Sequence, residues 1–250
     1  MSDERDLDPR LEWKLRAVAL PAALLLALAF NVSPLGHMLQ RTFLSMIPHE
    51  LGHAATGWFT GFAAVPGLWR TLVPDERSVV ITLGLALGLA AVAWRGWTTD
   101  RMWLVLIAIA GGLAQFFGTT SRLGTAATAI TFGGDAGALV IGTLLMLTFF
   151  AAEGSKLRAG QLRWGLLVIG AAAYVDVAMV WWRAKQDHDH IPFGEIERVG
   201  LSDPSKLLEE GWSPAQMVSR YLTVAAVCLA TLLAVWAWQT WRMRQRAIMA

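Results

Sequence analysis

Long apolar blocks separated by short polar stretches dominate the 250-residue chain. Their lengths approach the roughly 20 residues that a helix needs to cross a bilayer. The blocks cover about residues 17–35, 42–63, 78–94, 102–118, 136–152, 164–182 and 221–241. The pattern predicts an all-α fold, a polytopic transmembrane helical bundle with six or seven membrane segments.

Two parts of this pattern bear on the organisation of the chain. The 42–63 block contains Pro48, which is tolerated in a first helical turn and kinks a helix interior, so the segment either spans the membrane or re-enters it. Residues 184–218 form the one long polar insert, which we expect to be an extramembrane loop. We therefore predict a single integral membrane domain over residues 1–250, with the first apolar block retained as a span rather than cleaved as a signal peptide.

Composition and charge support the same class of protein. Hydrophobic residues make up 55% of the chain and charged residues 16%, compared with about 25% charged residues in soluble domains. The net charge of +2 is too small to indicate nucleic-acid binding. Short basic stretches at 95–101, 154–163 and the C-terminal tail are typical of cytoplasmic loops, which would leave 118–135 and 184–218 facing outward. We expect a multi-pass protein of a bacterial-type cytoplasmic membrane.

The most informative motif lies inside the second block, where the sequence reads His49-Glu50-Leu51-Gly52-His53. Positions i and i+4 share one face of a helix, so both imidazoles can reach the same metal ion. Glu50 can then take a proton from a water molecule at the metal. The single cysteine, Cys228, leaves no thiolate cluster as a competing metal site.

A zinc hydrolase needs a third protein ligand. Asp135 lies in the string Phe132-Gly133-Gly134-Asp135-Ala136-Gly137, where the glycines permit close approach, although an aspartate at the expected start of a helix also serves as an N-cap. The other candidates from the residues alone are Asp176, His188, His190 and Glu195. Asp176 could equally be a buried hydrogen-bonding group or a partner that orients a ligand histidine.

The string from Ile47 to Ala54, which contains the motif in an apolar segment, resembles the site-2 protease family of intramembrane zinc metalloproteases. The resemblance implies a Zn²⁺ ion held by His49, His53 and Asp135, with Glu50 as the catalytic base. It also implies a membrane protein or peptide substrate, cleaved in or near a transmembrane segment within the lipid bilayer. The alternatives are a non-proteolytic membrane protein that binds or transports metal, and a zinc hydrolase that acts on lipid.

Overall fold

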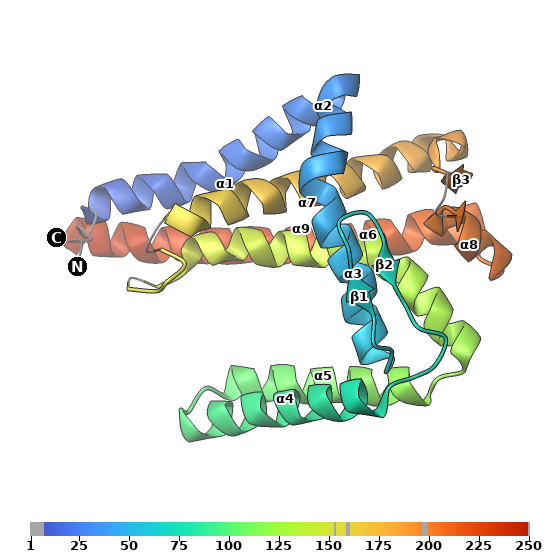
Figure 1. Cartoon of the computed structure of the whole chain (residues 1–250). Coiled ribbons are helices and arrows are strands. Elements are labelled where there is room, and N and C mark those ends of the chain that lie inside the picture. The colour runs from blue at the N-terminus through green and yellow to red at the C-terminus, as the bar shows by residue number, and fades with distance from the viewer. Residues whose placement is uncertain (1–7, 153, 159–160, 197–199, 250) are drawn as a thin grey trace. The chain divides into compact units, whose positions relative to one another are not determined.

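A computed structural model describes residues 8–152, 154–158, 161–196 and 200–249 of the chain. Among these residues, six helices are long and apolar enough to cross a membrane. The prediction of an all-α multi-pass membrane protein is therefore confirmed at the level of fold class. Figure 1 shows the helices in chain order.

The six long helices are α1 (Pro9–Val32), α4 (Val79–Thr98), α5 (Met102–Thr120), α6 (Leu123–Leu147), α7 (Leu162–Gln186) and α9 (Pro214–Met249). The shorter helical segments are α2 (Pro34–Leu39), the π-helix η1 (Gln40–Ser45), α3 (Met46–Phe59), α8 (Asp203–Glu209) and the 3₁₀ turns η2 (Thr148–Phe150) and η4 (His188–His190). Among the described residues, two small antiparallel strand pairs, the β-hairpins of this fold, are present: β1 (Val65–Pro66) with β2 (Thr71–Leu72), and β3 (Glu195–Ile196) with β4 (Gly200–Leu201).

One expected boundary differs from the structure. The stretch 118–135 was expected to be a loop, yet α6 already begins at Leu123, and Asp135 lies inside this helix rather than at its N-cap. Glycine and threonine make this stretch look like a loop, but a helix tolerates them where neighbouring helices pack against it. In the second block, helical backbone runs through η1 into α3 without a break at Pro48, which occupies the first turn of α3.

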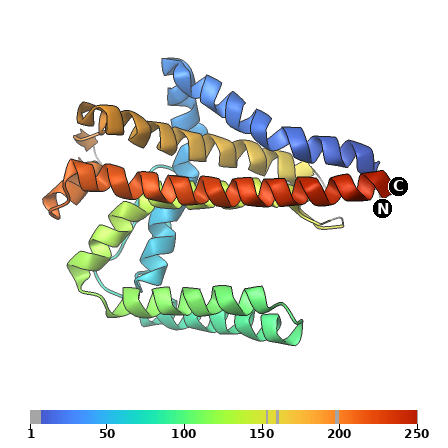
Figure 2. The same cartoon turned by 180° about the vertical axis from the view of Figure 1, so that it is seen from behind.

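The described residues divide into two compact units. The first contains the chain up to Pro48, Ala138–Ile191 and the chain from Ser213 onward. In this unit α1, α7 and α9 lie side by side, as the two opposite views show (Figures 1 and 2). The Trp181 and Tyr221 rings stack at a centroid distance of 4.1 Å, which fixes α7 against α9.

The second unit comprises His49–Gly137 and Pro192–Trp212. It contains α4 and α5 as an antiparallel helical hairpin, most of α3, the first part of α6, both β-hairpins and α8. Arg77 ties several of these elements together, because its guanidinium donates to the backbone carbonyls of Thr60, Gly118 and Ser121 at 2.9, 3.3 and 2.7 Å. The first two carbonyls lie at the C-terminal ends of α3 and α5, where helices leave acceptors without intrahelical partners.

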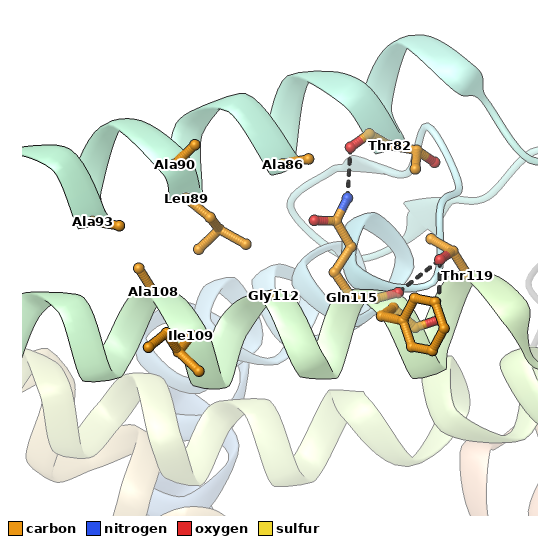
Figure 3. Close-up of a pocket in the computed structure, with 11 residues that line it drawn as sticks. Thr82, Ala86, Leu89, Ala90, Ala93, Ala108, Ile109, Gly112, Gln115 and Thr119 are labelled. Carbon is orange, nitrogen blue, oxygen red and sulfur yellow. Dashed lines mark hydrogen bonds between the residues drawn. The ribbon is translucent and has the colours of Figure 1, made fainter.

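A cavity of about 400 Å³ lies between α4 and α5 (Figure 3). Its walls are mainly alanine, glycine and larger apolar residues. The buried Gln115 donates from Nε2 to the carbonyl of Thr82 at 2.6 Å, an interhelical hydrogen bond that ties α5 to α4. We assign this polar group to helix packing.

Candidate metal centre

The two histidines of the motif lie on α3 with their imidazole rings edge to face, 4.7 Å apart at the centroids. Nδ1 of His53 is 2.7 Å from the carbonyl oxygen of Ile130, and Nδ1 of His49 is 3.0 Å from a carboxylate oxygen of Asp135. A carbonyl or a carboxylate only accepts, so each Nδ1 carries the hydrogen. In the neutral imidazoles both Nε2 atoms then present lone pairs, and they lie 3.1 Å from each other.

Asp203, the first residue of α8, brings a third electron-pair donor to the same point. Its Oδ2 is 3.2 Å from Nε2 of His49 and 3.0 Å from Nε2 of His53. Three ligand atoms around a tetrahedral zinc ion at 2.0–2.1 Å would be about 3.3 Å apart. The near-equilateral triangle of two nitrogens and one oxygen therefore fits a zinc-sized cation, and these three residues form a candidate metal group.

The surroundings of Asp203 favour its charged form. Lys206, one turn later on α8, approaches Oδ1 at 3.3 Å and leaves Oδ2 directed to the histidines. Burial acts to raise the pKa of Asp203, but hydrogen bonds and charge interactions with the imidazolium forms of His49 and His53 outweigh it and hold the pKa well below its usual range. Asp203 is thus a carboxylate at neutral pH, the form that binds metals.

Glycines make room for this arrangement on α6. A Cβ atom added to Gly134 would lie 2.5 Å from both Cε1 and Nε2 of His53, and 2.7 Å from Cε1 of His49. A Cβ added to Gly52 would lie 2.3 Å from the carbonyl oxygen of Gly133 and 2.8 Å from Cα of Gly137. The motif glycine on α3 therefore meets glycines of α6 where the two backbones cross, beside the imidazoles.

Glu50 is buried next to the first ligand in sequence. At 100° per residue, it lies about 60° around the helix from His53, on the same side of α3 as the ligands. Its carboxylate accepts a hydrogen bond of 2.7 Å from the hydroxyl of Thr71 on β2. A carboxylate that is adjacent to a metal group and held by a neutral donor is suited to proton transfer.

The structure brings together three of the residues singled out from the sequence, His49, His53 and Asp135, and Glu50 lies on the same side of α3. Asp135 contacts His49 through the nitrogen that is not part of the candidate metal group. Its role as a direct ligand stays a prediction, while the geometry favours a supporting role in which its carboxylate orients the imidazole.

Asp203 was not anticipated from the sequence. It belongs to the polar insert, where Ser202-Asp203-Pro204 indicates only the start of a short helix. Nothing in the spacing connects this position with a motif 150 residues earlier.

The other candidate ligands lie elsewhere among the described residues. Asp176 belongs to the first unit, where its fully buried carboxylate is 3.1 Å from both Arg41 Nη1 and His37 Nε2. His188 and His190 are exposed in η4, also in the first unit, and Glu195 is exposed on β3. None of them belongs to the candidate metal group found among the described residues.

Comparison of the chain with protein-family models, with curated proteins and with solved structures found no match. The fold and the site therefore define the class: a multi-pass membrane protein with a candidate His-His-Asp metal group.

Proposed function

We propose that the protein is an intramembrane zinc metalloprotease that hydrolyses a peptide bond in or near a transmembrane segment of a membrane protein. The observation that carries the proposal is the convergence of both Nε2 atoms and the Asp203 carboxylate beside Glu50, in a chain with six candidate spans. Two histidines, one carboxylate and an adjacent glutamate are the groups that zinc peptidases use.

Each residue has a role in this mechanism. His49, His53 and Asp203 would hold the zinc ion, which when bound lowers the pKa of water in its open position and polarises a carbonyl group. Asp135 and the carbonyl of Ile130 keep the two imidazoles in the ligating tautomer. Glu50 accepts the proton of the attacking water and later returns it to the leaving amine.

The substrate class follows from the membrane setting and from the resemblance to the site-2 protease family. A peptide bond inside a membrane helix is shielded by the hydrogen bonds of its own backbone. The helix must therefore unwind locally before attack, and small or helix-breaking residues near the scissile bond would favour cleavage.

Metal transport is a weaker alternative. A transport pathway needs successive ligand groups, and within the described ranges this is the one group in which three or more His, Cys, Asp or Glu side chains could share a metal ion. The histidines of this group are also locked by hydrogen bonds on their second nitrogens, which suits a fixed catalytic site better than a passing ion.

The test compares the wild-type protein with Glu50→Gln in proteoliposomes that contain single-span reporter peptides, with products identified by mass spectrometry. Glu50→Gln should keep its zinc and lose cleavage, whereas His49→Ala should lose both. Retained cleavage in Glu50→Gln would refute the mechanism. Release of fatty acid or head group from the vesicles, without peptide cleavage, would instead support a zinc hydrolase acting on lipid.

A further inference from the structure

The hydroxyl of Thr71 makes two short contacts with one residue, Glu50. Its Oγ1 is 2.7 Å from Oε2 of the Glu50 side chain and 2.8 Å from the Glu50 backbone carbonyl oxygen. We propose that Thr71 is a positioning residue that holds the Glu50 carboxylate in its working orientation. This inference rests on the proposed function, in which Glu50 is the base.

The side chain of Glu50 needs such a partner because it is buried, with 4% of the residue exposed. A buried carboxylate without a hydrogen bond is costly, and a free glutamate side chain would sample several rotamers. Among the described residues, the hydroxyl of Thr71 supplies the hydrogen bond that this carboxylate receives. Because that bond is made to Oε2, Oε1 stays available to accept a proton from water.

Thr71 can hold Glu50 because the hairpin that carries it is itself fixed. Thr71 pairs with Pro66 across the two strands, and Gly67 donates to the carbonyl of Arg70 at 3.0 Å to close the turn. The indole of Trp58 on α3 donates to the carbonyl of Ala64 at 2.8 Å, just before β1.

The far end of the hairpin is also closed. Phe62 and Arg77 form a β-bridge, and the Arg77 guanidinium lies over the Phe62 ring at 5.6 Å. The position of the Thr71 hydroxyl is therefore set by contacts on both sides of the hairpin, independently of the Glu50 side chain.

The Thr71 hydroxyl contacts none of the three candidate metal ligands among the described hydrogen bonds. The one hydroxyl hydrogen of Thr71 is shared between the two Glu50 oxygens, whereas the three candidate ligands are held by Asp135, Ile130 and Lys206. Removal of the hydroxyl should thus leave zinc binding intact and affect the catalytic step alone.

The first test is kinetic and compares Thr71→Val, which keeps the shape and removes the hydroxyl, with Thr71→Ser, which keeps the hydroxyl. Thr71→Val should lower kcat about tenfold or more, short of the roughly hundredfold to ten-thousandfold expected when the base itself is lost. KM and zinc content should change by less than about twofold, because ground-state binding is not altered. Thr71→Ser should restore most of kcat.

The matched control is Thr98→Val, an exposed threonine of α4 whose hydroxyl bonds only to carbonyls of its own helix. This variant should behave as the wild type. Equal kcat values for Thr71→Val and the wild type, or a loss in Thr71→Ser as large as that in Thr71→Val, would overturn the positioning role.

The second test needs neither zinc nor activity. A double-mutant cycle of Thr71→Val and Glu50→Ala is measured by thermal unfolding of the chelator-treated full chain in detergent. The fall in Tm of the double variant should be smaller than the sum of the two single falls, because each single change already removes the shared hydrogen bond. Additive shifts would overturn the inference. If the wild type cleaves no peptide, the proposed function fails, while this cycle still decides whether Thr71 holds Glu50.

Discussion

Substitution of Asp203 and of Asp135 by asparagine should weaken zinc binding to different extents. In Asp203→Asn, the anionic oxygen 3.0–3.2 Å from both Nε2 atoms is replaced by a neutral amide, so a ligand charge is lost. In Asp135→Asn, both Nε2 atoms and Asp203 remain, and the asparagine oxygen can still accept from Nδ1 of His49. Loss of a partner that orients a ligand typically costs tenfold to hundredfold in metal affinity, about 1.4–2.8 kcal/mol. Asp135→Asn should lie at the lower end of this range, and Asp203→Asn should exceed it.

The assay is zinc competition against a chelator of known affinity, with the purified full-length protein in detergent. Asp187→Asn serves as a matched control, because Asp187 is an acid of the same polar insert whose side chain is 57% exposed. Its zinc affinity should equal that of the wild type. The reverse order, with Asp135→Asn the more damaging change, would refute the assignment and restore Asp135 as the third ligand.

A spectroscopic experiment tests directly whether Asp203 or Asp135 is the third metal ligand. Cysteine is a good ligand for zinc and for the cobalt that replaces it. In a Cys228→Ala background, which removes the only native thiol, Asp203→Cys loaded with cobalt should show a thiolate-to-cobalt charge-transfer absorption. Asp135→Cys should show none, because that position faces the other nitrogen of His49.

Two further predictions concern the same centre. Gly134→Ala should weaken zinc binding by about 1–3 kcal/mol, because its Cβ would overlap the His53 ring. The control is Gly88→Ala on α4, where a Cβ meets no atom within 4 Å. Equal zinc affinities for the two variants would contradict the proposed overlap. Asp203 should release no proton when zinc binds, because its lowered pKa keeps it ionised. Calorimetry in two buffers of different ionisation enthalpy counts the protons released, and a count that falls in Asp203→Asn would contradict the prediction.

The membrane helices could be predicted from the sequence because a bilayer imposes a length and an apolar composition on each span separately. Such information is local and can be read from consecutive residues. The start of α6 was predicted wrongly because the sequence supplies only this local information. Residues 123–135 are rich in glycine and threonine, and their helical state depends on close packing with α3, which composition does not reveal.

Some residues of the metal centre can likewise be predicted from neighbouring sequence, and others cannot. His49, Glu50 and His53 lie within five residues of one helix, so helical periodicity alone places both imidazoles on one side. Asp203 lies in the polar insert, 150 positions after His53, and Thr71 lies in a hairpin, 21 positions after Glu50. Folding brings both of them to the motif. An aspartate before a proline and a threonine in a strand are common features, and only the folded chain distinguishes these two.

The glycines explain why the motif and the Asp135 segment belong together. Gly52 lies between the two ligand histidines on α3, and its Cα is opposite Gly137 of α6, where an added Cβ on Gly137 would lie 2.2 Å from it. This close crossing brings the α6 backbone near enough for Ile130 to accept from His53 and for Asp135 to accept from His49. A larger residue at position 52 would separate the helices and release both imidazoles, although neither ligand had been changed. One helix crossing is therefore formed by two parts of the sequence, Gly52 of the motif on α3 and the string Gly133-Gly134-Asp135-Ala136-Gly137 on α6. This crossing fixes both histidines in the ligating tautomer.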